Sequence, residues 1–364
     1  MRYLDEFREE RDIREILEKI RACITPPVKL MEVCGTHTMA IFRHGIVKLL
    51  PEKITLVSGP GCPVCVTPIK EIDKAIKLSR EKGVIITTFG DLLRVPGSNS
   101  SLEKERARGA EVKVVYSTYE ALKIARSNPR KKVVFLGVGF ETTVPTVAAA
   151  LLKAHADGIK NFFVLSFHKL VPPALETLLR QDGLNLSGLI LPGHVSVIIG
   201  SRRYQSLADI YHVPGVVGGF EPRDILEAIY MLLKQIQNQE ARIEIQYQRG
   251  VSLEGNKKAQ RYISHVFEPF SSSWRGLGEI PLSGLKLRED FATFDGEKYF
   301  DLEVPEAGEP EGCCCGEVLR GIKSPNDCPL FGKRCSPENP VGACMVSHEG
   351  TCAAYYKYQG RMAL

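Results

Sequence analysis

The stretch ITLVSGPGCPVCVTPIKEIDKAI, residues 54–76, contains the unit from which this fold is built. A run rich in β-branched residues at 54–58 predicts a strand, the Gly-Pro-Gly at 59–61 predicts a turn, and apolar residues at helical spacing farther on predict a helix. Cys62 and Cys65 stand between the turn and the helix with CxxC spacing. The fold class depends on how often this strand-turn-helix unit recurs, and the function depends on what the cysteine pair does.

Runs that are nearly continuous in apolar residues alternate with amphipathic segments from residue 27 to residue 240. Such runs are typical of parallel strands that helices cover on both faces. The sequence therefore predicts an α/β fold with two similar parallel-sheet (βαβ) domains that face a cleft. The runs are VKLMEV (28–33), ITLVS (54–58), VIITTF (84–89), VKVVYS (112–117), VVFLGVGF (133–140), FFVLSF (162–167), LILP (189–192) and GVVGGF (215–220).

Changes in composition predict the domain boundaries. The basic segment SNPRKK (127–132) is typical of a linker, so we predict domain I at residues 27–127 and domain II at residues 128–240. Residues 241–364 mix polar residues with sparse apolar ones and end in a cysteine-rich segment. We predict that they form a third, mixed domain together with residues 1–26.

The composition disfavours several classes of function. A net charge of +5 on 364 residues gives no reason to expect nucleic acid or an anionic membrane as a partner. Residues 4–20 predict a charged amphipathic helix, which we expect to dock on the third domain, and they lack the apolar core of a signal peptide. No apolar run is long enough to span a membrane. We therefore predict a cytoplasmic protein. The chain also lacks a P-loop and the CxxxCxxC motif of radical SAM enzymes.

Seven of the eleven cysteines lie near the carboxyl end of the sequence. In a reducing compartment, clustered cysteines indicate metal or redox chemistry rather than a disulfide framework. Cys313, Cys328, Cys335 and Cys352 are separated by fourteen, six and sixteen residues, on loops rich in proline and glycine. This pattern favours an iron-sulfur cluster over a zinc ribbon, which needs two closely spaced pairs, and over free buried thiols. Counting leaves open which cysteine of 313–315 is a ligand.

Cys34 and His37 belong to a second candidate group, in the segment MEVCGTHT (31–38). Cys34 follows a predicted buried strand and precedes a predicted helix, whose N-terminus is expected to lower the pKa of the thiol. Cys34 is thus a candidate nucleophile or soft ligand for iron or copper, and a small buried apolar residue is the alternative. His37 is a candidate cleft residue, with helix capping or surface exposure as the alternative.

The CxxC pair and two further residues lie at predicted strand ends. Cys62 and Cys65 occupy the strand-to-helix position of a thioredoxin-like redox pair, and half of a metal site is the alternative. His194 and Glu141 follow strands, where ligands of open α/β sheets bind. Both are candidate proton carriers or ligands, whereas a structural histidine and a helix-capping glutamate are the alternatives.

Five motifs, in this order, are similar to those of one known family. CGTHT (34–38), GPGCPVCV (59–66), GFETT (139–143), PGHVS (192–196) and the spacing of the tail cysteines resemble the HypD family of hydrogenase maturation proteins. The resemblance extends from about residue 4 to 360, which is nearly the whole chain.

The resemblance implies an assembly scaffold with redox chemistry rather than a turnover enzyme. Proteins of this family help to build the Fe(CN)2CO group of nickel-iron hydrogenases. They work with a HypC-type small chaperone and receive cyanide from a HypE-type donor. The implied fold has two similar α/β domains and a third domain that carries a 4Fe-4S cluster.

Residue by residue, the resemblance implies that Cys34 holds the transient iron that carries cyanide and CO, shared with a cysteine of the chaperone. Cys62 and Cys65 are then the dithiol/disulfide pair that exchanges electrons with the cluster, and His194 lies in the cleft near the iron. Two alternatives stay open: an iron-sulfur thiol-disulfide oxidoreductase with many substrates, and a binding module with a zinc-stabilised tail. The implied ligands of the 4Fe-4S cluster are Cys313, Cys328, Cys335 and Cys352.

Overall fold

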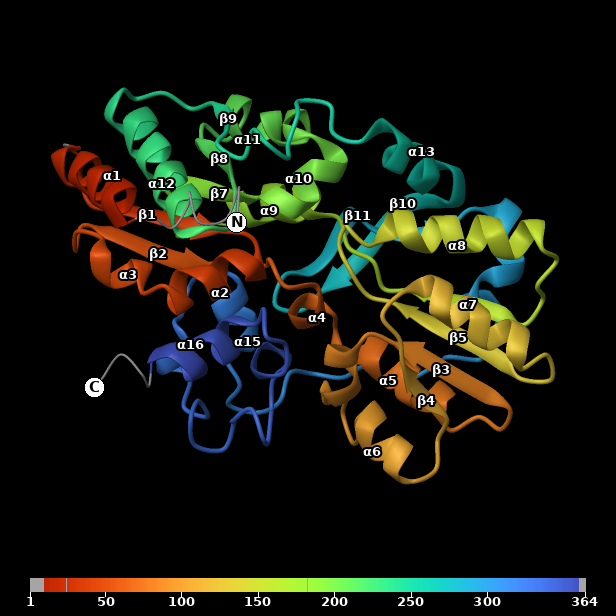
Figure 1. Cartoon of the computed structure of the whole chain (residues 1–364). Coiled ribbons are helices and arrows are strands. Elements are labelled where there is room, and N and C mark those ends of the chain that lie inside the picture. The colour runs from red at the N-terminus through yellow and green to blue at the C-terminus, as the bar shows by residue number, and fades with distance from the viewer. Residues whose placement is uncertain (1–9, 24, 182, 360–364) are drawn as a thin grey trace.

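The computed structural model describes residues 10–23, 25–181 and 183–359 and has the predicted α/β class, with two parallel sheets (Figure 1). All eight predicted strands are present in these sheets. The first sheet has the strand order β2-β1-β7-β8-β9, and the second has the order β4-β3-β5-β6. The strands are β1 Val28–Glu32, β2 Ile54–Ser58, β3 Val84–Thr88, β4 Val112–Val114, β5 Lys132–Gly137, β6 Phe162–Ser166, β7 Gly188–Pro192, β8 Gly215–Gly218 and β9 Ile243–Ile245.

Both faces of each sheet are covered, which explains why the strands appear in the sequence as continuous apolar runs. In β5, Val134 and Leu136 pack into the core on one face of the second sheet, whereas Val133 and Phe135 pack into the core on the other. The first sheet likewise contributes to two cores. A parallel strand that buries both sets of side chains cannot show the alternation of a half-exposed strand.

The helices also fall into two groups, one packed on each sheet. Those that share a core with the first sheet are α1 Glu10–Ala22, α2 Gly35–Arg43, α3 Ile46–Leu49, α9 Val171–Leu179, α10 Gly193–Ile199, α11 Gln205–Asp209, α12 Pro222–Gln237 and the 3-10 helix η3 Ser201–Tyr204. Those that share a core with the second sheet are η2 Gly90–Arg94, α5 Ile69–Ser79, α6 Leu102–Ala107, α7 Thr118–Ser127, α8 Val144–Ala156, α13 Lys257–Val266 and η4 Glu289–Phe294, while α14 Gly296–Tyr299 packs on β6.

The strand pairing does not follow the predicted division between residues 127 and 128. β1 and β2, from predicted domain I, belong to one sheet with β7 and β8 of predicted domain II. β3 and β4 pair instead with β5 and β6. The second sheet is therefore continuous in sequence, from residue 84 to residue 166, and is inserted between the two halves of the first.

The segment SNPRKK explains this difference. It is the short connection between α7, which ends at Ser127, and β5, which begins at Lys132 and pairs with β3. A surface loop within a sheet has the same polar composition as a linker between domains. Apolar runs therefore identify the strands, but they do not say which strands are neighbours.

The first helix also packs elsewhere than expected. In the described part of the chain, α1 lies on α12 and shares a core with the first sheet, rather than with the cysteine-rich tail (Figure 1). Residues 4–9 of the predicted helix lie outside the described residues. That residues 241–364 form a separate domain stays a prediction.

The chain passes between the sheets at two crossovers. The first crossover, residues 59–83, connects β2 to β3 and carries Cys62 and Cys65. The second, residues 167–187, connects β6 to β7 and carries His168. The cysteine pair thus lies where the chain leaves one sheet for the other.

An antiparallel hairpin that the sequence pattern did not predict contacts both crossovers (Figure 1). It consists of β10 Phe267–Trp274 and β11 Gly278–Leu287. The amide of Arg275, in its turn, donates to Val66 O of the first crossover at 2.8 Å. Ser283 O accepts from the amide of Leu170 of the second crossover at 2.8 Å. Since both bonds are made by the backbone, the hairpin ties the crossovers together regardless of side chain.

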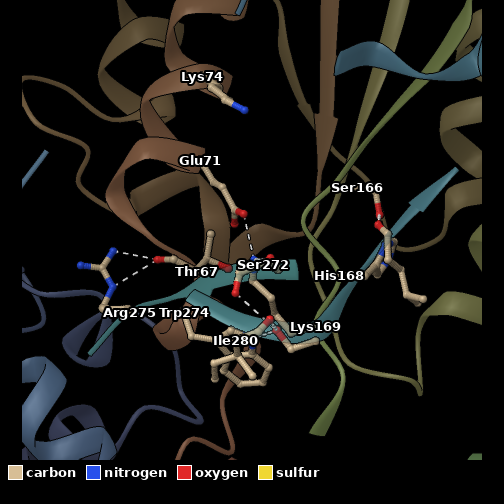
Figure 2. A network of polar contacts seen from close by, with 12 residues as sticks. Thr67, Glu71, Lys74, Ser166, His168, Lys169, Ser272, Trp274, Arg275 and Ile280 are labelled. Carbon is tan, nitrogen blue, oxygen red and sulfur yellow. Dashed lines mark hydrogen bonds and ion pairs between the residues drawn. The ribbon is translucent and has the colours of Figure 1, made fainter. Parts of the chain in front are cut away.

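His168 of the second crossover predicts an acid-sensitive step in stability. Its Nδ1 lies 3.0 Å from Ser166 Oγ, its buried Nε2 has no partner among the described residues, and burial lowers its pKa to about 3 (Figure 2). The unfolded chain takes up this proton near pH 6.5, so the stability is present above that pH and is lost as the pH falls toward 3.

We expect His168→Gln to flatten this dependence. Between pH 6 and pH 4 the unfolding free energy of the wild type should fall with a slope steeper by up to about 1.4 kcal/mol per pH unit than that of the variant. Urea unfolding at several pH values measures the slope. His155→Gln, at an exposed position, is the control and should leave the slope unchanged. Equal slopes for wild type and His168→Gln would contradict the prediction.

Candidate functional site

Cys34 lies at the point where the strand order of the first sheet reverses. β1 is followed in the chain by its neighbour β2 on one side, whereas β7 lies on its other side. Cys34 follows β1, and His194 follows β7. The crevice beyond the carboxyl ends of two such strands is where open α/β sheets bind ligands. The topology therefore brings these two predicted site residues to the same switch point.

The loop that carries Cys34 is packed directly against the loop that leads to the cysteine pair. The amide of Gly35 donates to Gly61 O at 3.0 Å. A Cβ atom on Gly61 would lie 2.3 Å from Cys34 N, so this close approach requires glycine. The motifs CGTHT and GPGC, separated in sequence, are thus in contact through their backbones.

Glu32, which sequence reasoning missed, fixes the Cys34 loop through hydrogen bonds of its side chain. The buried carboxyl accepts a 3.1 Å bond from the amide of Cys34 through Oε2 and a short bond from the Thr38 hydroxyl through Oε1. Burial raises the pKa of Glu32 to about 8. The available signal was an acidic residue at the end of an apolar strand, because such a residue needs partners when it is buried.

The thiol of Cys34 does not have the lowered pKa that its place at a helix N-terminus predicted. Burial, with a further contribution from the carboxylate of Glu349, raises its pKa to about 12. The nine-residue helix α2 cannot offset the loss of hydration, and two acidic groups lie nearby. Cys34 is therefore a protonated thiol until a metal cation displaces its proton or a base accepts it. Its side chain makes no capping bond that would compete with a ligand.

His37 is buried, so the alternative of a surface or capping residue is wrong, and its role as a cleft residue stays a prediction. Its Nε2 lies 2.9 Å from Gly219 O, and its Nδ1 has no partner among the described residues. Burial lowers the pKa of His37 to about 4, and the ring is therefore neutral. The Phe220 ring stacks on His37 at 4.8 Å and on the partly exposed His194 at 3.9 Å. The two predicted histidines are thus joined through one aromatic ring.

The sequence allowed Glu141 to cap the helix that follows it, but the structure shows that it does not. Its Oε1 accepts a 3.0 Å bond from the amide of Val171 at the start of α9, and its buried Oε2 has no partner among the described residues. Burial raises the pKa of Glu141 to about 7. A carboxyl with one free oxygen and this pKa can exchange protons near neutral pH.

Tyr204, a second residue that sequence reasoning missed, interacts electrostatically with both Glu141 and Cys34. It is fully buried, and its hydroxyl lies 3.4 Å from Ser196 Oγ. Burial raises its pKa, and the charges of Glu141 and Cys34 raise it further, so the three groups interact electrostatically. The sequence offered only the spacing of a core aromatic residue here.

Cys62 and Cys65 form a disulfide, with their Cα atoms 5.2 Å apart. Cys62 caps the short helix α4, Pro63–Val66, and its Sγ accepts from the amide of Cys65 at 3.2 Å. Their exposed fractions are 3% and 0%, so the pair is closed off from the surface. The predicted disulfide is formed, and in this state neither sulfur is available as a metal ligand.

The tail cysteines gather around one small pocket with apolar walls. In the described part of the chain, no three His, Cys, Asp or Glu side chains are already arranged as a metal site. The donor set nevertheless fits an iron-sulfur cluster, because several thiols converge and the amide of Val341 donates to Cys335 Sγ at 3.3 Å. The pocket is lined by Cys313, Cys314, Cys315, Cys328, Cys335, Cys344 and Cys352, with Val318, Leu330, Phe331 and Met345.

The four predicted ligands are thus brought together, but three further thiols lie at the same pocket. Cys315 Sγ is 2.7 Å from Cys344 Sγ, closer than two ligands of one cluster would be. The geometry does not choose between Cys313 and its neighbours as the first ligand.

The tail packs on both motif helices. The 3-10 helix η6, Ala343–Met345, contacts α4, and α16, Thr351–Gln359, contacts α2 (Figure 1). The rings of Phe42 and Tyr355 lie 4.2 Å apart, and the hydroxyl of Thr36 donates to Glu349 Oε1 at 2.8 Å. The disulfide belongs to one apolar core with four of the tail cysteines, which are Cys315, Cys335, Cys344 and Cys352. The remaining tail helices are α15 Cys315–Leu319 and η5 Pro325–Asp327.

Comparison with known families agrees with this arrangement of motifs. A sequence model of HypD, described as "Hydrogenase formation hypA family", matches residues 11–359. The chain belongs to the HypD family. The motifs around Cys34, the disulfide and the tail are therefore those of a hydrogenase maturation family, and the expected resemblance is confirmed.

Three relatives are similar to this HypD-family chain over nearly their whole length. The "Hydrogenase maturation factor HypD" of Azotobacter vinelandii is 48% identical over 367 residues, which cover 98% of this chain and 97% of the relative. The factor of the same name from Cupriavidus necator is 45% identical, with 98% and 97% covered, and that from Escherichia coli is 43% identical, with 99% and 98% covered. In the portion of the chain described by the structure, no helix is long and apolar enough to cross a membrane.

Proposed function

We propose that this chain is a cytoplasmic scaffold on which the Fe(CN)2CO group of nickel-iron hydrogenase is assembled. Cys34 holds the iron, a HypC-type chaperone shares it, and a HypE-type protein donates cyanide. The observation that carries the proposal is the position of Cys34, a buried thiol at the switch point of the first sheet that contacts both the cysteine-pair loop and the tail. Soft thiolate ligation and exclusion of water suit low-spin iron with strong-field ligands.

Each residue of the site has a separate task in this proposal. Glu32 and the two neighbouring glycines hold the Cys34 loop in place. Cys34 must lose its proton when iron binds, and Glu141, with its free oxygen and a pKa of about 7, exchanges protons there. Tyr204 interacts electrostatically with both groups. The stacked rings of His37, Phe220 and His194 form an aromatic stack beside the site, with buried His37 on its inner side and exposed His194 on its outer side.

The cysteine pair supplies electrons. Reduction breaks the Cys62–Cys65 bond and forms two thiols, which takes up two electrons and two protons. A 4Fe-4S cluster held by Cys313, Cys328, Cys335 and Cys352 would relay electrons one at a time from a ferredoxin-type or flavodoxin-type donor protein. The shared apolar core of disulfide and tail supports this arrangement.

The burial of the disulfide argues against the alternative of a general thiol-disulfide oxidoreductase. An enzyme that reduces many protein substrates presents one sulfur to them, whereas both sulfurs here are enclosed. Steady-state reduction of a protein disulfide with many turnovers per chain would favour that alternative instead.

Infrared spectroscopy tests the proposed function directly. The chain should be purified without oxygen together with a HypC-type partner from cells that make cyanide for this group. Bands of iron-bound cyanide and CO in the complex are expected. A complex that contains iron but lacks both kinds of band would contradict the proposal.

Replacing Cys65 with alanine should abolish assembly while leaving the tail cofactor intact. The variant cannot form the disulfide, but none of the tail thiols is altered. Visible absorbance and iron content report the cluster, and infrared bands report assembly. Val64→Ala, in the same turn, is the control and should assemble normally. Full assembly by Cys65→Ala would show that the pair is not the electron store.

A further inference from the structure

Arg275 is a buried arginine between the disulfide helix and the tail. Its exposed fraction is 3%, although arginine is rarely buried without partners. Nε and Nη2 donate to Thr67 O at 3.2 and 2.9 Å (Figure 2). Nη1 donates to Glu309 Oε2 at 2.7 Å. Its amide donates to Val66 O at 2.8 Å. The residue thus holds the two carbonyl groups that end α4, directly after Cys65.

The other neighbours of Arg275 are acidic. Burial alone would lower the pKa of Arg275, but the thiols of Cys315 and Cys344 and the carboxyl of Glu309 raise it above its usual value. The guanidinium is therefore a permanent positive charge beside the cysteine pocket. Because it is shielded from water, its field in the apolar core is weakly screened.

We propose that Arg275 is a positioning residue for electron exchange between the Cys62–Cys65 pair and the tail sulfurs. It fixes the end of α4 against the tail, and its charge stabilises the negative charge that an added electron brings. This inference rests on the proposed redox function of the same site. It concerns a residue outside the five motifs, contributed by the hairpin.

The geometry requires the guanidinium fork rather than a simple cation. Two nitrogens bind one carbonyl, while a third binds Glu309 on another segment. A lysine would retain the charge but make fewer of these bonds. Arg275→Lys therefore separates the two parts of the proposal, charge and positioning, whereas Arg275→Gln removes the charge and keeps a donor.

The sign of the expected effect follows from the charge. A buried cation favours the reduced, more negative form of a nearby redox centre and so raises its midpoint potential. Removing the cation should make the tail cofactor harder to reduce. The cysteine pair takes up two protons with its two electrons and gains no charge, so its potential should change less. A role in folding alone would change stability but would not shift the potential of the tail cofactor in this direction.

The test uses the full-length chain, purified without oxygen and assayed for iron and sulfide. The midpoint potential of the tail cofactor is measured by a spectroscopic redox titration, and that of Cys62–Cys65 by equilibration with reduced and oxidised dithiothreitol. For Arg275→Gln we expect the one-electron equilibrium to shift about tenfold toward the oxidised form, about 59 mV. Arg275→Lys should return the potential most of the way to the wild-type value.

Lys323 provides a matched control. Its Nζ lies 3.7 Å from Cys314 Sγ at the same pocket, but 38% of its side chain is exposed, so water and salt screen its charge. Lys323→Gln should shift the potential less than twofold. An effect as large as that of Arg275→Gln would overturn the proposal, because it would reflect net charge rather than a buried group.

The remaining outcomes are distinguishable. An unchanged potential in Arg275→Gln, with iron and sulfide present, would overturn this inference and leave the proposed function standing. Wild-type protein without iron and sulfide would overturn both. If Arg275→Gln does not fold, Arg275→Lys decides. A wild-type potential of the tail cofactor in Arg275→Lys would then support the proposed role of the charge, and a shift as large as tenfold would contradict it.

Discussion

Replacing Cys34 with alanine is expected to remove every infrared band of iron-bound cyanide and CO from the chain purified with the proposed HypC-type chaperone. The reason is that Cys34 is the soft donor at the switch point of the first sheet, and its side chain is free of capping bonds. The neighbouring site groups are carboxyl, phenol and imidazole, which bind low-spin iron poorly by comparison. The loss should therefore be complete rather than partial.

The fold and the tail should survive this substitution. A buried thiol replaced by a methyl group leaves a small cavity and no unpaired charge. Circular dichroism, iron content and the visible spectrum of the proposed cluster check this. Cys23→Ala is the matched control. Cys23 is also buried, but among the described residues its thiol donates to Lys19 O, in the last turn of α1. Cyanide and CO bands that persist in Cys34→Ala would mean that another residue holds the iron.

The second large effect is expected at the ion pair between the crossovers. Lys169 has a side chain that is 1% exposed, and its Nζ donates to Glu71 Oε1 at 2.8 Å and to Ser272 Oγ at 2.7 Å (Figure 2). These residues come from the second crossover, the first crossover and the hairpin. Glu71→Gln leaves the ammonium buried without a counter-ion and should cost about 3 kcal/mol of unfolding free energy.

A double-mutant cycle tests this expectation. Lys169→Met combined with Glu71→Gln removes the buried charge, so most of the lost stability should return. Denaturant unfolding of the wild type, both single variants and the double variant gives the coupling energy. Lys298→Met, which breaks an exposed ion pair with Glu289, is the control and should cost less than about 1 kcal/mol. Additive losses in the double variant would show that the pair is not coupled.

The strands illustrate how far the sequence predicts this fold. Every apolar run, from VKLMEV to GVVGGF, is a strand, because burial on both faces leaves a strong local pattern. The short β9 and the hairpin were missed. Ser271, Ser272 and Ser273 carry no apolar signal, and the buried members of β10 near its end are only Ser272 and Trp274. Their inward direction is set by the crossovers that they contact.

The site was predicted where chemistry is concentrated in a motif and was missed where it depends on neighbours. Cys34, the disulfide and the gathering of the tail thiols followed from residue type and spacing. Glu32, Tyr204 and Arg275 did not, because each is recognisable only by its burial and by its partners from distant segments. Depth of burial also reversed the expected direction of the Cys34 pKa.

By itself, the sequence determined the strands, the α/β class, the family and the candidate cysteines, since each of these follows from local pattern or from a motif. Only the tertiary structure decided that β1 pairs with β7 across the inserted second sheet, and that the tail closes over Cys34 and the disulfide. The physical reason is that strand pairing and burial are set by contacts between segments far apart in the chain. Local pattern reports how much of a strand is buried, but it does not report what buries it.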